Sequence, residues 1–159
     1  MANERSRCYF VYCWENDYSV IKRIKERVVK QSNNRVEVIL DRQSFQVASS
    51  INHCESQIVN SDSVVVFFSP EYKKIISEGD ANRGVYREYQ YIKNKFMIAP
   101  NSIIPVLLKG KREDAITPEF FDSICSDLTA LSFEKNDRGR VVITRGKESL
   151  RQLVDNIIS

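Results

Sequence analysis

Glu88 is the residue of this 159-residue chain whose type and placement best fit a chemical role. It follows the apolar run Ser63–Phe68, which predicts a buried parallel strand, and it lies in the first turn of a helix expected to begin at Val85. Ligands of open parallel sheets bind beyond the carboxyl ends of the strands, where such a helix starts. On spacing alone, Glu88 also fits a solvated helix residue that pairs with Arg87 or Lys93. Both interpretations stay open at this point.

A lone carboxylate is sufficient for one class of reaction. Breaking a glycosidic bond passes through an oxocarbenium-like cation, which a fixed carboxylate stabilises. The nicotinamide of NAD+ departs neutral from a positively charged ring, so it needs little help as a leaving group. A single glutamate such as Glu88 would be enough for that cleavage.

Other common chemistries lack their residues. No G-x-G-x-x-G segment follows a strand and no G-x-x-x-x-G-K-[ST] loop is present, so the usual phosphate-binding loops are missing from the sequence. Ser69 stands at the end of the third predicted strand, where a phospho-acceptor receiver domain has aspartate. The single histidine, His53, falls in a predicted helix, which leaves histidine-dependent catalysis and a zinc site without partners.

Length and composition predict one globular domain spanning residues 1–159. A chain of this length buries roughly 70% of its unfolded surface without disulfides. The net charge of +3 is small and the basic residues are scattered, so we expect no nucleic-acid partner. Because no apolar run approaches membrane-spanning length, we expect no membrane partner either. The widely spaced cysteines are expected to be reduced thiols of a cytoplasmic protein: Cys8, Cys13, Cys54 and Cys125.

Strands and helices alternate along the chain. This order predicts an α/β fold of the flavodoxin-like type, a five-stranded parallel sheet of order 2-1-3-4-5 with helices on both faces. The proline of the fourth strand, Pro105, suits a position near the edge. The expected strands are 7–13, 36–40, 63–68, 102–108 and 128–133; the expected helices are 18–31, 48–60, one from 85, a short one at 117–121 and 147–158, with a charged loop at 134–140.

In this sheet order the ligand crevice lies between strands 1 and 3. The exits of the first three strands therefore bring five residues to the neighbourhood of Glu88: Tyr12, Cys13 and Trp14 from the first strand, Asp41 from the second and Ser69 from the third. Trp14 either stacks on a ligand ring or packs on the first helix. Asp41 either lines the crevice or holds its own loop through backbone N–H groups, as turn aspartates do.

Four segments in order carry a resemblance to a known family. Tyr9–Glu15 resembles the box written F-I-S-Y-S-W-D, and 38–42 resembles the second strand running into the BB loop of that family. The segment 64–72 resembles its third strand and S-P-x-Y turn, and Gly84–Glu88 falls where it has W-C-x-x-E or G-V-x-x-E. On these segments the chain resembles a TIR domain of the bacterial type, close to the related SEFIR domains.

The resemblance implies that NAD+ is a substrate, cleaved to nicotinamide and ADP-ribose or a cyclised product, with no separate cofactor. It implies a role in bacterial antiviral defence and activity on self-assembly with other TIR domains. Gly84 stands where many active members have tryptophan. The alternative is a non-catalytic module that binds other TIR domains through the BB loop and adjacent helices. The resemblance implies Glu88 as the catalytic residue and a pocket lined by Tyr12, Trp14, Asp41, Phe45, Ser69 and Tyr86.

Overall fold

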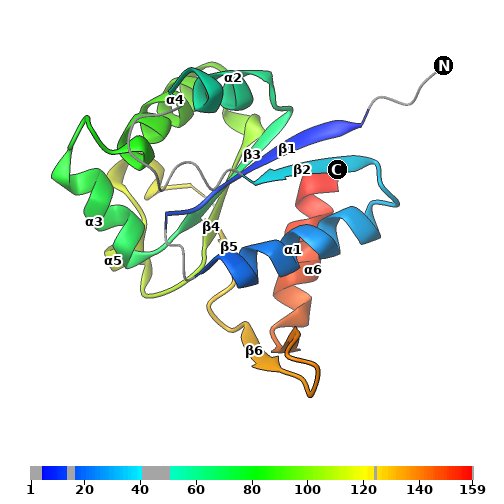
Figure 1. Cartoon of the computed structure of the whole chain (residues 1–159). Coiled ribbons are helices and arrows are strands. Elements are labelled where there is room, and N and C mark those ends of the chain that lie inside the picture. The colour runs from blue at the N-terminus through cyan, green and yellow to red at the C-terminus, as the bar shows by residue number, and fades with distance from the viewer. Residues whose placement is uncertain (1–4, 14–16, 41–50, 124, 159) are drawn as a thin grey trace.

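A five-stranded parallel sheet forms the centre of the molecule (Figure 1). The computed structural model describes residues 5–13, 17–40, 51–123 and 125–158. The strand order is 2-1-3-4-5, which confirms the predicted flavodoxin-like sheet. All four strand pairings are parallel. The strands are β1 (Ser6–Val11), β2 (Val36–Leu40), β3 (Ser63–Phe68), β4 (Ile103–Leu107) and β5 (Ser126–Asp127).

Helices cover both faces of this sheet (Figure 1). The residues Val64 to Phe68 of β3 are all buried, because apolar layers lie on either side of the strand. One face packs against α1 (Tyr18–Gln31) and α6 (Lys147–Ile158). The other face packs against α2 (Ile51–Asn60), α3 (Pro70–Glu78) and α4 (Gly84–Ile98), together with the short α5 (Arg112–Ala115) and the 3-10 turn η4 (Pro118–Phe120). A second 3-10 turn, η3 (Pro100–Ser102), lies between α4 and β4 in the chain.

The helix α3 was not expected, because Ser69 and Pro70 were interpreted only as the end of β3. Both residues instead start the helix. The Oγ of Ser69 accepts a hydrogen bond from the backbone N–H of Tyr72, and Pro70 occupies the first helical position, where a missing N–H costs nothing. Gly79 ends the helix with a positive φ of 65°.

The C-terminal third also differs from the expectation. The fifth strand was placed at 128–133, but β5 lies at Ser126–Asp127, and Leu128 and Leu131 pack on the α1/α6 side of the sheet as part of a turn. The region that follows is a separate antiparallel hairpin, formed by β6 (Ser132–Lys135) and β7 (Val141–Arg145). The expected charged loop at 134–140 overlaps the end of β6 and the hairpin turn.

Pro105 lies on the outer side of β4. The N–H of Leu108 donates to Phe68 of β3, and the carbonyl of Leu107 accepts from Leu128 beyond β5. Because backbone groups alternate in direction along a strand, Pro105 faces the β5 side, as Leu107 does. The two residues of β5 pair only with Val106 and Leu107, so they do not reach Pro105. The missing N–H of Pro105 therefore breaks no bond of the ladder, which agrees with the expected place near the edge.

Candidate functional site

Glu88 lies inside the molecule rather than on the outside of its helix. Its side chain is 1% exposed, so the alternative of a solvated helix residue is wrong. The helix α4 begins at Gly84, one residue before the expected start, and it has no acidic residue in its first turn. Glu88 is its fifth residue and belongs to the second turn. The carboxylate points toward the sheet face that carries α2, α3 and α4, because its partner Tyr9 belongs to the apolar cluster on that face.

The hydroxyl of Tyr9 donates a hydrogen bond of 2.7 Å to Oε2 of Glu88. Tyr9 lies in the interior of β1 and is fully buried, so this bond joins the second turn of α4 to the strand at the centre of the sheet. A hydrogen bond to an ionised acceptor is shorter and stronger than one between neutral groups. Tyr9 was not among the predicted site residues, because nothing in the spacing of residues 9 and 88 indicates their contact.

Tyr72 contributes a second hydroxyl to the same region. Its ring packs edge-on against Phe68 and Tyr89, at centroid distances of 5.6 and 6.1 Å. Its hydroxyl is buried and has no hydrogen-bond partner among the described residues. Burial, and next to it the charge of Glu88, raises the pKa of the Tyr72 phenol well above its ordinary value. The phenol therefore keeps its proton.

Cys13 and Ser69 meet where β1 and β3 end. The Sγ of Cys13 and the Oγ of Ser69 are 3.8 Å apart, and both side chains are buried. Burial raises the pKa of the Cys13 thiol to about 12, only partly offset by the contact with Ser69. Since the thiolate is the reactive form of cysteine, Cys13 is a poor nucleophile here. Ser69 is placed at the expected strand exit, on the same side of the sheet as Tyr72.

A charged pair lies next to these strand exits. Asp17, which precedes α1, is buried and forms an ion pair with Lys109, which follows β4. Gly110 comes next with φ of 79°, and a Cβ added there would lie 2.7 Å from the ring of Pro70. The loop after β4 therefore packs tightly against the start of α3, which fixes the place of Lys109. This ion pair was not predicted from the sequence.

The structure brings together only part of the predicted pocket. Tyr12 lies on the other face of the sheet from Glu88, where its ring packs 6.5 Å from that of Tyr18. Tyr86 is half-buried on α4, two residues before Glu88, so helix geometry turns the two side chains apart. Three predicted lining residues lie outside the described residues: Trp14, Asp41 and Phe45.

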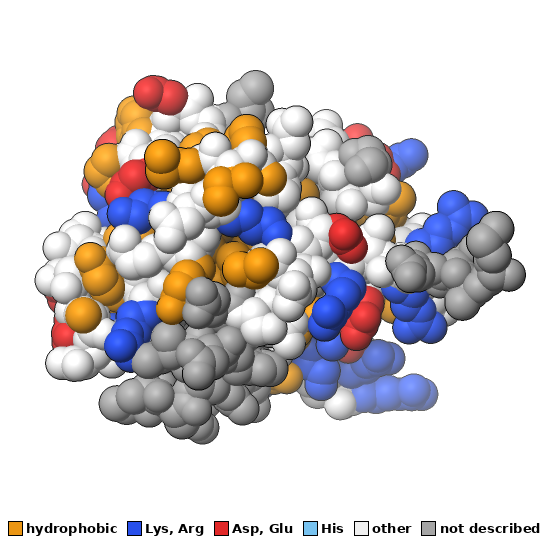
Figure 2. All heavy atoms as spheres, turned by 90° about the horizontal axis from the view of Figure 1, so that it is seen from above, with side chains coloured by type: hydrophobic (Ala, Val, Ile, Leu, Met, Phe, Trp, Pro, Cys, Tyr) orange, Lys and Arg blue, Asp and Glu red, His pale blue; other side chains and the backbone are white. Residues whose placement is uncertain are grey.

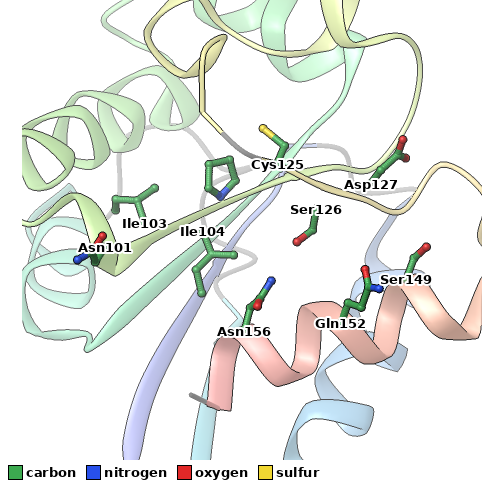
Figure 3. A pocket seen from close by; sticks show the side chains of 10 residues that line it. Asn101, Ile103, Ile104, Cys125, Ser126, Asp127, Ser149, Gln152 and Asn156 are labelled. Atoms are coloured by element: carbon green, nitrogen blue, oxygen red, sulfur yellow. The ribbon is translucent and has the colours of Figure 1, made fainter.

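A hollow of about 680 Å³ lies elsewhere, between the start of β4, β5 and α6. In Figure 3 the side chains of Ile104, Ser126, Gln152 and Asn156 surround it. It includes none of the predicted site residues. Its lining holds one carboxylate, that of Asp127, and the thiol of Cys125 among hydroxyls, amides and apolar groups, so it offers no paired carboxylates for chemistry on a bound molecule.

A cluster of exposed apolar side chains lies at the C-terminal ends of α2 and α4. Val59, Met97 and Ile98 are 63%, 83% and 86% exposed. Lys95 joins the two helix ends, because its Nζ donates to the carbonyl of Ser61 at 2.6 Å. Figure 2 shows this side of the molecule, with apolar side chains gathered among Lys and Arg residues. Exposed apolar groups of this kind are typical of contact surfaces.

The chemistry available at Glu88 is that of one carboxylate fixed in place by the hydrogen bond from Tyr9. Such a group, enclosed by apolar and aromatic side chains, stabilises positive charge much more strongly than it would in water. Among the described residues no three His, Cys, Asp or Glu side chains are placed to hold a metal ion. Likewise, the part of the chain that is described contains no helix long and apolar enough to cross a bilayer.

The comparisons with known proteins agree with this fold. A family model described as "TIR domain" matches residues 9–144. A solved structure, the crystal structure of a prokaryotic SEFIR domain, superposes with a TM-score of 0.64 at 20% sequence identity, covering 97% of this chain and 93% of that one. At that identity the likeness concerns the fold alone. No curated protein matches the sequence. Because the family match covers most of the chain, this protein belongs to the TIR domain family.

Proposed function

We propose that this TIR domain cleaves the bond between nicotinamide and ribose in NAD+, as a glycohydrolase or an ADP-ribosyl cyclase, with Glu88 as the acting carboxylate. The observation that carries the proposal is the burial of Glu88 with the hydroxyl of Tyr9 on its Oε2. Burying a carboxylate is costly, and such groups concentrate at functional sites. Because Glu88 is almost completely enclosed, the proposed reaction requires that the site opens to admit the substrate.

In the proposed reaction, the bond from C1′ of the ribose to the ring nitrogen breaks. Both bonding electrons leave with nicotinamide, which departs as a neutral molecule. The carboxylate of Glu88 stabilises the positive charge left on the ribose. Water then adds to C1′ and releases a proton, which gives ADP-ribose; in the cyclase alternative an adenine nitrogen takes the place of water. NAD+ is the substrate, and no cofactor takes part.

The proposal retains the lining residues that belong to the strand exits. Ser69 lies at the end of β3, and Trp14, Asp41 and Phe45, which follow β1 and β2 in the sequence, are kept as proposed substrate-binding residues. Self-association is part of the proposal, with the BB loop of one copy closing the pocket of the next. Contacts of that kind do not close on themselves and so produce open-ended assemblies. Activity would then rise faster than linearly with protein concentration.

The test is the release of nicotinamide from NAD+ by concentrated protein, followed by chromatography of the products. Glu88→Gln keeps an oxygen for the Tyr9 hydroxyl but removes the charge, so we expect activity to fall at least about 100-fold, the usual effect of losing one electrostatic stabiliser. Glu78→Gln, at the exposed end of α3, is the matched control and should keep full activity. Equal turnover by wild type and Glu88→Gln would remove Glu88 from the mechanism.

A second candidate function is a non-catalytic module that binds other TIR domains. The exposed side chains of Val59, Met97 and Ile98 favour it, because they offer an apolar contact surface away from Glu88. The same preparation separates the two functions. A protein that associates in light scattering yet releases no nicotinamide at any concentration is a binding module, whereas nicotinamide release that depends on Glu88 identifies an enzyme.

A further inference from the structure

Burying the hydroxyl of Tyr72 costs folding free energy, and packing alone does not explain why it is there. The side chain is 0% exposed, and its oxygen lacks a hydrogen-bond partner among the described residues. A buried polar group without a partner loses its bonds to water and gains none in return. Phenylalanine would fill the same space without that loss. The buried hydroxyl therefore has hydrogen-bonding capacity that the described residues leave unused.

The ring of Tyr72 is not free to turn its hydroxyl elsewhere. It packs between Phe68, at the end of β3, and Tyr89 of α4. Its backbone is held as well, because the N–H of Tyr72 donates to Ser69 at the start of α3. A partner for the hydroxyl must therefore come to it.

The surroundings of the hydroxyl define the chemistry of that partner. The charge of Glu88 acts on the Tyr72 phenol, and burial keeps the phenol protonated. The two residues share one layer, because the ring of Tyr89, which follows Glu88, packs on that of Tyr72, and Tyr9, which bonds Glu88, belongs to the same apolar cluster as Tyr72. A group that reaches both would meet a donor in Tyr72 and, in Glu88, a carboxylate that only accepts. A phosphate or carboxylate would be repelled by Glu88, and an amide carbonyl would satisfy Tyr72 alone. An alcohol hydroxyl accepts from Tyr72 and donates to Glu88, so it fits both.

We propose that Tyr72 is a substrate-binding residue whose hydroxyl, together with Glu88, binds a sugar hydroxyl. This inference rests on the proposed function, in which that sugar is the ribose of NAD+ next to the bond that breaks. The opening that admits the substrate to Glu88 also admits its ribose to Tyr72. The interaction orients C1′ toward the carboxylate, and a small geometric gain of this kind strongly affects the rate.

The test compares wild type with Tyr72→Phe in three measurements: the thermal melt without ligand, the Kd for ADP-ribose by calorimetry, and kcat/KM for nicotinamide release. We expect the Tm of the variant to rise by about 2–4 °C, because an unsatisfied buried group is removed. We expect its Kd for ADP-ribose to rise about 5- to 10-fold and its kcat/KM to fall by a similar factor. Tyr91→Phe, a half-buried tyrosine at the margin of the same apolar layer, should change none of the three.

The outcomes separate this inference from the proposed reaction. If Tyr72→Phe binds ADP-ribose as tightly as wild type, or if wild type does not bind it, the inference is wrong. A lowered Tm with unchanged Kd would mean that a trapped water satisfies the hydroxyl, which also overturns it. Weakened binding in the variant, with no nicotinamide release by either protein, supports Tyr72 and refutes the reaction. Equal release by both proteins supports the reaction and refutes Tyr72.

Discussion

The hydrogen bond from Tyr9 to Glu88 permits a quantitative prediction. Tyr9→Phe keeps the ring in its buried place on β1 and removes only the hydroxyl, which lies 2.7 Å from Oε2 of Glu88. A hydrogen bond to a charged group contributes about 1.5–3 kcal/mol. We therefore expect the free energy of unfolding to fall by about that amount. For a chain of this length, the Tm should drop by about 3–12 °C.

The same bond has a predicted effect on activity. Tyr9 lies on β1, between β2 and β3, and its hydroxyl already donates to Oε2 of Glu88, so in the proposed function it holds the carboxylate rather than the substrate. At 1.36 kcal/mol for each factor of ten, the loss of the bond predicts a decrease in kcat of about 10- to 150-fold. If Glu88 acts as proposed, the KM for NAD+ should change little, because Tyr9 then positions Glu88 and is not a substrate-binding residue.

The assay combines a thermal melt with nicotinamide release over a range of NAD+ concentrations, with Tyr91→Phe as the control for loss of a tyrosine hydroxyl. A variant that melts within 1 °C of wild type, by the roughly 2–4 °C expected per kcal/mol, would show that the bond adds little to stability. A lower Tm with an unchanged kcat would show that the bond is structural only. A raised KM with an unchanged kcat would contradict the positioning role of Tyr9.

Two further predictions concern the residues around the strand exits. Gly110→Ala should lower the free energy of unfolding, measured by urea denaturation, by about 2–4 kcal/mol, because the new Cβ adds a clash with Pro70 to the strain of a positive φ. Gly79→Ala is the control: its φ of 65° is also positive but nothing lies near the new Cβ, so we expect a loss of only about 1 kcal/mol. Equal losses of stability in the two variants would show that the contact with Pro70 adds nothing to the effect. Burial raises the pKa of Cys13 to about 12, so between pH 7 and pH 9 its thiol stays protonated and iodoacetamide should label it far more slowly than the half-buried Cys125. Peptide mapping by mass spectrometry measures both rates, and equal labelling would contradict this account of burial.

The first four strands of the central sheet were predictable because they are distinct apolar runs in the sequence. The run Ser63–Phe68 is apolar at nearly every position, as strands covered on both faces are, and the alternation with helices set the strand order. The helix Tyr18–Gln31 was found at its exact bounds because its apolar residues recur at helical spacing.

The helix α3, the strand β5 and the hairpin β6–β7 were not predicted correctly, although the sequence contains signals for some of them. Ser69 followed by Pro70 is both a strand end and a helix start, and only the first was used. Leu128 and Leu131 are apolar because they pack against the α1/α6 side of the sheet, and apolar character alone does not distinguish a strand from a packed turn. The hairpin turn was indicated by Asn136 and Gly139, since Gly139 has φ of 76° and its N–H donates to Asn136.

The candidate site was predictable only in part. Glu88 was identified through its segment, but its contact with Tyr9 joins residues 79 positions apart, and no local pattern encodes such a pair. Tyr12 was grouped with the pocket because it lies near the end of β1. Successive side chains of a strand point to opposite faces of the sheet, so Tyr9 and Cys13 lie on one face and Tyr12 on the other. Following this two-residue period along β1 would have removed Tyr12 from the predicted pocket.

The place of Pro105 has a consequence for how copies of this protein come together. An uncovered stretch of β4 next to the short β5 would be a template on which a neighbouring chain could add strand after strand, as in fibrils. Pro105 interrupts the row of donors on that stretch, so continuous backbone pairing between molecules is blocked there. If this TIR domain assembles as proposed, contacts along this stretch of β4 must use side chains and loops, which makes them sensitive to single substitutions.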